Sequence, residues 1–187
     1  MTSCQVKQRA LELGFDLCGI APARDLEGLA RLPQWLARGY GGRMTYLNRT
    51  ARVRADVRRW LPSARSVVAV ACLYNTAGPR HVEMADAARA RIARYAWGDD
   101  YHDVMGRRLA ALAGWMRDEA GPGFDARWSV DDGPAQEKVY ASRAGIGWPR
   151  RRGARRARCP RGPCSPVTPT DGSTPGLRPR PVCNRIA

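Results

Sequence analysis

The chain has 187 residues, which is enough for one domain with a hydrophobic core. Hydrophobic residues make up 44% of it, and no apolar run approaches the roughly 20 residues that cross a bilayer. We therefore expect no membrane span, and because no secretory signal is visible at the start, a cytoplasmic protein. The net charge of +15 suggests a polyanionic partner such as nucleic acid.

The first part of the chain predicts two helices around a strand. One helix begins at Ser3, a capping residue, and ends at Gly14. A short strand follows over residues 15–20. Asp25 is expected to cap a second, amphipathic helix, which Pro33 should bend or divide. Its apolar side consists of Leu26, Leu29, Leu32, Trp35 and Leu36.

The middle of the chain continues the alternation of strands and helices. Residues 66–74, SVVAVACLY, predict a strand covered on both faces at the centre of the sheet. Residues 103–120 predict a helix with one buried stripe, and residues 124–130 alternate like a half-buried strand. After a turn, Pro134 suits the first position of a helix that continues to Ala144. The fold class is therefore α/β, an α+β sandwich with a mixed sheet flanked by helices.

Residues 149–187 have a different character from residues 1–148. They hold eight prolines and ten arginines, with Asp171 as the one acid, and no aromatic residue. Such a segment cannot bury enough surface to order itself, so we expect a disordered basic tail. The abrupt change suggests an out-of-frame reading, and the competing interpretation is a genuine basic tail.

The cysteines of a cytoplasmic chain are expected to stay reduced. Cys18 and Cys72 lie inside apolar runs, where a free cysteine packs like a small hydrophobic residue. Cys159, Cys164 and Cys183 offer three thiolates at spacings that match neither a zinc site nor an iron–sulfur site. We therefore predict no metal site in the chain.

Three segments carry a family pattern: RADVRRWLPSARSVV at 54–68, ARYAWGDDYHDVMGRRL at 93–109 and VDDGPAQEKVYASRAGIGW at 130–148. Together they resemble the epoxyqueuosine reductases, over about residues 5–148. The resemblance implies a cobalamin-binding enzyme that also uses two [4Fe-4S] clusters. It implies reduction of epoxyqueuosine to queuosine in the anticodon loop of tRNA, with electrons from a separate donor, by a protein expected to be a monomer.

By this resemblance, Asp131 aligns with an acid that protonates the departing epoxide oxygen. The local sequence alone favours another role, in which Asp131 or Asp132 caps the helix that begins near Pro134. A helix N-terminus stabilises a carboxylate, so an acid catalyst there requires burial to keep its proton. With the resemblance, Asp131 is the catalytic candidate and Asp132 the cap.

The resemblance also implies residues that contact the cofactor. They are Arg58, Arg94, Tyr95, Asp100, Tyr101, His102 and Glu137. Aromatic faces and hydrogen-bonding tips suit a flat macrocycle with amide arms. The alternatives from local sequence are a turn and helix cap at residues 98–100, core packing for Tyr95, and exposed charges for Arg58 and Glu137.

The sequence departs from the family after Trp148, where the family continues into a cysteine-rich ferredoxin-like module and this chain does not. Without those cluster ligands there is no evident route for electrons to cobalt. We therefore expect a truncated reductase with little or no turnover as this chain alone. The alternative function is a basic nucleic-acid-binding protein that grips phosphates with its Arg/Pro-rich tail.

Overall fold

The computed structural model describes residues 1–24, 26–74, 86, 88, 90 and 92–147. The helices are α1 (Ser3–Glu12), α2 (Arg31–Ala37), α3 (Thr45–Ala55), α4 (Tyr101–Ala120) and α5 (Glu137–Arg143). Three 3-10 turns, η1 (Glu27–Ala30), η2 (Val57–Arg59) and η3 (Arg94–Ala96), lie between them. The strands are β1 (Leu17–Pro22) and β2 (Ser66–Ala71). The expected α/β class is confirmed.

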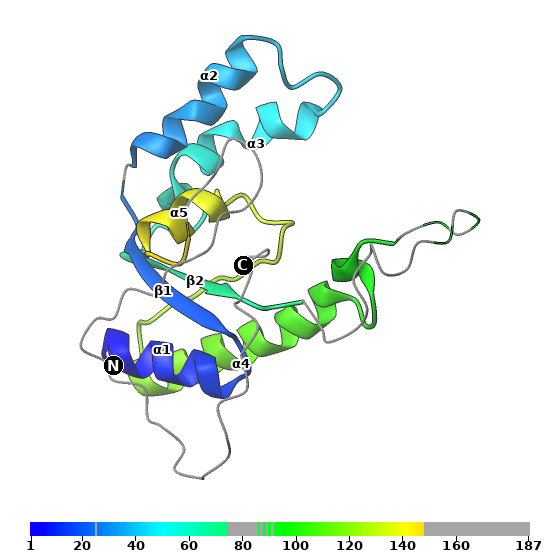
Figure 1. The fold of residues 1–187 in the computed structure, drawn as a ribbon. Coiled ribbons are helices and arrows are strands. Elements are labelled where there is room, and N and C mark those ends of the chain that lie inside the picture. The colour runs from blue at the N-terminus through cyan, green and yellow to red at the C-terminus, as the bar shows by residue number, and fades with distance from the viewer. Residues whose placement is uncertain (25, 75–85, 87, 89, 91, 148–187) are drawn as a thin grey trace.

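The two strands pair antiparallel, with Leu17 opposite Ala71 and Pro22 opposite Ser66. Within the described residues they form a two-stranded sheet and not the mixed sheet we expected. Figure 1 shows α1 and α4 on one side of this ribbon and α5 on the other. The sheet is therefore narrow, and the helices that pack on its two faces stabilise it.

Alternation along β2 gives each face of the sheet its own core. Val70 is fully buried and joins Phe15, Leu109 and Leu112 beneath α1 and α4. The neighbouring residues Ala69 and Ala71 point the other way and pack under α5. The prediction that this strand is covered on both faces is thus confirmed.

Small residues let α5 approach the sheet closely. A Cβ atom on Gly19 of β1 would lie 2.7 Å from the carbonyl oxygen of Ala144, just after α5, and 2.9 Å from a side-chain carbon of Ile146. Because such distances are far inside van der Waals contact, only glycine permits this packing. Gly19 therefore fixes how deeply α5 sits, and with it the position of Glu137 at the start of the helix.

The helix α4 agrees with the sequence prediction for residues 103–120. It begins two residues earlier, at Tyr101, because the side chain of Asp100 accepts a hydrogen bond from the backbone N–H of His102 and caps the helix. Met105, Leu109 and Leu112 form its buried stripe, and Met116 packs against the same core. The long, regular apolar period is what made this element predictable.

Several expectations for the helices were wrong in detail. The helix predicted from Ser3 is capped by Thr2, whose side chain accepts from the backbone of Gln5. The second helix is divided into η1 and α2, as one of the two expectations for Pro33 had it, but the division lies before Arg31 and Pro33 is inside α2; Asp25 lies outside the described residues. Trp35, expected on the apolar side, is 36% exposed. The last helix begins at Glu137 and not near Pro134.

The strand expected over residues 124–130 is also wrong, since that segment has no regular structure. Its backbone carbonyl at Ala126 accepts a hydrogen bond from the guanidinium of Arg117, and the side chain of Arg127 donates to the carbonyl of Trp60. One backbone carbonyl of this segment is thus bound by an arginine side chain and not by a neighbouring strand. The period-2 pattern reflects a half-buried segment without a strand partner.

Cys18 and Cys72 pack against the core beneath α1 and α4, as expected. Burial raises the pKa of the Cys18 thiol to about 11, so it stays a thiol at neutral pH. No described helix is both long and apolar enough to cross a bilayer. The predicted basic tail, residues 149–187, lies outside the described residues.

Candidate active site

Asp131 lies in a tight turn between α4 and α5. Its backbone has φ of 60°, in the left-handed region, which aspartate tolerates better than most residues do. The backbone N–H of Asp132 donates to the carbonyl of Val130 at 2.7 Å, and Val130 itself is buried. The turn therefore holds a non-glycine residue in a strained conformation directly beside the core, a feature common at functional sites.

The carboxylate of Asp131 is exposed and accepts a hydrogen bond from the hydroxyl of Tyr101 at 2.7 Å. Tyr101 is the first residue of α4, so the contact joins two of the sequence motifs across 30 positions. Asp132 behaves differently from our expectation. Its side chain accepts from the backbone N–H of Val130 at 3.2 Å, and α5 has no side-chain cap. The prediction that Asp132 caps this helix is wrong.

A row of aromatic rings leads away from Asp131. Tyr101 and Tyr95 meet edge to face with centroids 6.5 Å apart, and Tyr95 meets Tyr74 in the same way at 6.2 Å. The ring of His102 lies 4.0 Å from that of Tyr101. Tyr95 is 42% exposed, so the core-packing alternative is wrong for this residue. The structure thus brings together four rings whose faces and polar tips remain partly open to solvent.

Asp100 and His102 pair with each other at the start of α4. One oxygen of Asp100 lies 2.8 Å from Nδ1 of His102 and also accepts the backbone N–H of that residue. These hydrogen bonds hold the pKa of Asp100 below its ordinary value of 3.8. Both side chains are exposed. The expected helix cap at Asp100 is confirmed, and the cap leaves its second oxygen available to a ligand.

Glu137 is the first residue of α5 and is half-buried. Burial, followed by the negative charge of Asp131, raises the pKa of Glu137 from 4.5 to about 7, against the opposing charge of Arg54. Asp131 and Glu137 therefore form a pair of carboxyl groups in different surroundings. The expectation that Glu137 is only an exposed charge is wrong, because burial gives it a proton near neutral pH.

Gln136 and Arg54 support this pair, and neither was among our candidates. The side-chain amide of Gln136 donates to the backbone carbonyls of Leu29 and Arg54, at 3.1 and 2.8 Å. It thereby joins the start of α5 to η1 and to the end of α3. Arg54 lies in the motif at residues 54–68 and Gln136 in the motif at residues 130–148. Nothing in the local sequence shows that these two segments are in contact.

Two predicted cofactor residues have other partners. The guanidinium of Arg58 binds both oxygens of Asp56, at 2.8 and 3.1 Å. The guanidinium of Arg94 lies over the ring of Trp97, 5.4 Å from its centroid. Asp56 also accepts the backbone N–H of Arg58, so this pair stabilises the turn η2. The geometry within the described residues groups Tyr95, Tyr101, Asp131 and Glu137 most clearly.

Comparison with known proteins shows which proteins this chain resembles. A family model described as Epoxyqueuosine reductase QueG, DUF1730 matches residues 54–132. The epoxyqueuosine reductase of Gloeobacter violaceus is 46% identical over 149 residues, which are 79% of this chain and 44% of that protein. This chain is a relative of the epoxyqueuosine reductases. It spans less than half the length of the curated relatives it matches.

Solved epoxyqueuosine reductases share the fold. One, crystallised with an epoxyqueuosine-modified tRNA-Tyr stem loop, matches with a TM-score of 0.60 and 26% identity over 77% of this chain and 38% of that one. The Bacillus subtilis enzyme, with a catalytic loop bearing an aspartate swung out of the active site, matches with a TM-score of 0.55 and 25% identity over the same shares. No comparison favours the alternative of a basic nucleic-acid-binding protein.

Proposed function

We propose that residues 1–147 form the part of an epoxyqueuosine reductase that binds the cofactor and delivers protons to the substrate, and that Asp131 is the proton donor. The observation that carries this proposal is the hydrogen bond from Tyr101 to an exposed Asp131 carboxylate held in a strained turn. The relative from Bacillus subtilis, whose catalytic loop bears an aspartate, supports this assignment.

The reduction of epoxyqueuosine requires protons, which we propose that Asp131 supplies. Conversion of an epoxide to an alkene consumes two electrons and two protons and releases water. When the carbon–oxygen bond breaks, the oxygen leaves as an alkoxide unless an acid protonates it. Asp131 is exposed within the described residues, so the burial that an acid catalyst requires would come from a bound cofactor and substrate. Burial and the charge of Asp131 raise the pKa of Glu137 to about 7, and we propose it as a second source of protons.

We propose that the residues around Tyr95 and Tyr101 would hold a corrin cofactor. The rings of Tyr95 and Tyr101 offer apolar faces beside hydroxyl groups, and the free oxygen of Asp100 and the ring of His102 add polar contacts for amide arms. When bound, cobalamin supplies a strongly nucleophilic metal centre. The chain's own residues position the substrate beside it and deliver protons. We extend the proposal to tRNA as substrate, a separate electron donor, and a monomer working in the cytoplasm.

Cobalamin binding tests the proposal directly. Adding the purified chain to cobalamin is expected to change the visible absorption spectrum of the cofactor, since the protein alters the surroundings of the cobalt. Replacing Tyr95 with alanine should weaken the binding, whereas Arg107→Gln, on the exposed side of α4, should not. Absence of any spectral change at saturating protein would contradict the assignment.

A chemically driven turnover tests the role of Asp131. With cobalamin, a strong reductant and an epoxyqueuosine-containing stem loop, we expect slow queuosine formation because the reductant replaces the natural electron route. Asp131→Asn should reduce this rate by about 100-fold or more, the usual contribution of a general acid. The matched variant Asp132→Asn should stay within a few-fold of the parent chain. Equal rates for both variants would show that Asp131 is not the proton donor.

A further inference from the structure

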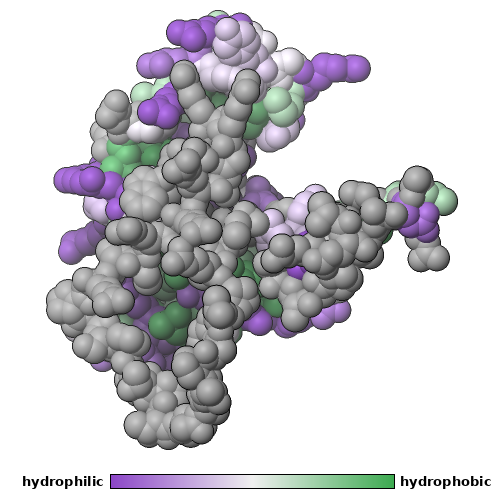
Figure 2. Space-filling model, viewed as in Figure 1, coloured by the Kyte–Doolittle hydropathy of each residue, from purple (hydrophilic) through white to green (hydrophobic). Residues whose placement is uncertain are grey.

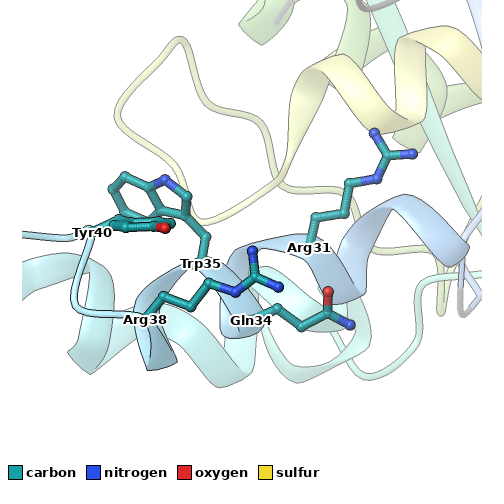
Figure 3. A pocket seen from close by; sticks show the side chains of 5 residues that line it. All are labelled: Arg31, Gln34, Trp35, Arg38 and Tyr40. Carbon is teal, nitrogen blue, oxygen red and sulfur yellow. The ribbon is translucent and has the colours of Figure 1, made fainter.

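The helix α2 exposes a polar and aromatic stripe on one side. Arg31, Gln34, Trp35 and Arg38 recur at steps of three, one and three, which places them on one face of a helix. All four are exposed, and α2 has no fully buried residue. Figure 3 shows Arg31, Gln34 and Arg38 projecting from the same side of the helix, with the Trp35 and Tyr40 rings at one end. This stripe is therefore a surface feature and not part of the core.

The stripe borders a surface hollow of about 640 Å³, lined by Arg31, Gln34, Trp35, Arg38 and Tyr40. The rings of Trp35 and Tyr40 meet edge to face with centroids 6.2 Å apart, and Tyr40 is 59% exposed. Two planar rings thus form one wall beside two guanidinium groups. Such a hollow can accept a flat aromatic group next to an anion.

The segment that forms this end of the molecule is strongly basic. Residues 28–55 contain no acidic residue and no lysine, and six arginines, which are Arg31, Arg38, Arg43, Arg49, Arg52 and Arg54. Within the described part of the chain, Arg31 and Arg38 form no ion pair or hydrogen bond. In the space-filling view, strongly hydrophilic side chains gather over the end formed by α2 and α3 (Figure 2). The surface therefore keeps its positive charge available for a partner.

We infer that the α2 surface, defined by Arg31, Gln34, Trp35, Arg38 and Tyr40, binds RNA. Guanidinium groups contact phosphates in a fixed two-pronged geometry, and an unstacked base can lie against the exposed rings. The choice of RNA as the partner rests on the proposed function, in which tRNA is the substrate. The surface lies on α2, at the opposite end of the molecule from α4 (Figure 1), so it is a second contact with the RNA, separate from the site around Asp131.

Charge and shape favour RNA over an anionic membrane. A membrane-binding helix inserts a broad apolar face, but Leu32 and Leu36 of α2 are half-buried and therefore turned away from this stripe. The exposed rings stand beside guanidinium groups and a hollow, and do not form a continuous apolar face. An arginine and aromatic surface of this kind matches the combination of phosphate and base that single-stranded RNA presents.

Binding of a fluorescein-labelled RNA stem loop, followed by anisotropy with the full chain and no cobalamin, tests the inference. The double variant Arg31→Gln with Arg38→Gln should bind more weakly and reduce the slope of log affinity against log salt by about 1.5, because each lost phosphate contact removes about 0.7 to 0.9. Trp35→Ala should weaken binding about tenfold with an unchanged salt slope, since stacking releases no counterions.

The matched control is Arg107→Gln with Arg143→Gln, which removes the same charge from exposed positions on α4 and α5. It should leave the slope and the affinity close to those of the parent chain. Equal losses in both double variants would mean that only net charge matters and would overturn the inference. So would unchanged RNA binding together with lost binding to vesicles of phosphatidylcholine and phosphatidylserine.

Thermal melting of each variant should match the parent chain, because every replaced side chain is exposed. Cobalamin binding is measured separately, so a failure of the proposed function is distinguishable from a failure of this inference. If cobalamin binds and the α2 variants bind RNA like the parent, only the RNA surface is wrong. If cobalamin does not bind but the α2 variants lose RNA binding, only the proposed function is wrong.

Discussion

Glu137 makes the stability of the protein depend on pH in an unusual direction. The pKa of this carboxyl group rises from 4.5 in a solvated chain to about 7 in the folded protein. Between these two values the folded state binds more protons than the unfolded state, so the free energy of unfolding falls as pH rises through this range. Above about pH 7 the folded protein carries the full cost of an ionised Glu137.

The size of the effect follows from the shift. A rise of this extent corresponds to roughly 3 kcal/mol for a group removed from water. Because Glu137 is only half-buried, solvent screens its charge, and we expect about 1 to 2 kcal/mol. Replacing Glu137 with glutamine removes the charge and keeps the shape. Glu137→Gln should therefore stabilise the protein by about 1 to 2 kcal/mol at about pH 8 and by almost nothing at about pH 4.

Urea unfolding followed by tryptophan fluorescence measures the two free energies at each pH. Glu119→Gln, at an exposed position on α4, is the matched control and should change little at either pH. Because Asp131 is the second cause of the raised pKa, Asp131→Asn should reduce the gain from Glu137→Gln in a double-mutant cycle. A gain of equal size at both pH values would refute the reasoning, since it would not depend on ionisation.

Three further predictions concern packing and the contacts of the site, and urea unfolding checks each. Gly19→Ala places a Cβ 2.7 Å from a backbone carbonyl oxygen and should cost about 1–3 kcal/mol, whereas an effect below about 0.5 kcal/mol would show that α5 shifts freely. Leu112→Ala, in the core beneath α4, should cost about 2–5 kcal/mol, and the exposed Leu11→Ala should cost far less. Tyr101→Phe removes the hydrogen bond to Asp131 and should cost up to about 1 kcal/mol; unchanged stability together with unchanged turnover would show that the bond has no role.

The elements that the sequence predicted well are those whose apolar period is long and regular. The stripe of Met105, Leu109 and Leu112 marked α4, and the run at residues 66–74 marked β2. The helix α3 was missed because it has no fully buried residue and carries an arginine or polar residue at most positions. Its helical state is stabilised by its neighbours, as its packing on α2 and η1 shows, and local periodicity does not report such packing.

The sequence predicted which residues belong to the candidate site, but not the contacts between them. The motifs supplied Tyr101, Asp131 and Glu137 as separate candidates. That the hydroxyl of Tyr101 reaches Asp131 depends on where the first turn of α4 meets the loop before α5. That Glu137 is half-buried depends on Gly19 and on the anchoring of Gln136 to η1 and α3. Burial and charge pairing arise from tertiary packing, so spacing along the chain could not show them.

The two carboxyl groups of the candidate site, Asp131 and Glu137, lie in different surroundings. Asp131 is exposed and accepts a hydrogen bond from the hydroxyl of Tyr101. Glu137 is half-buried, and this burial raises its pKa to about 7. Because the negative charge of Asp131 raises the pKa of Glu137, removal of that charge in Asp131→Asn should lower the pKa of Glu137.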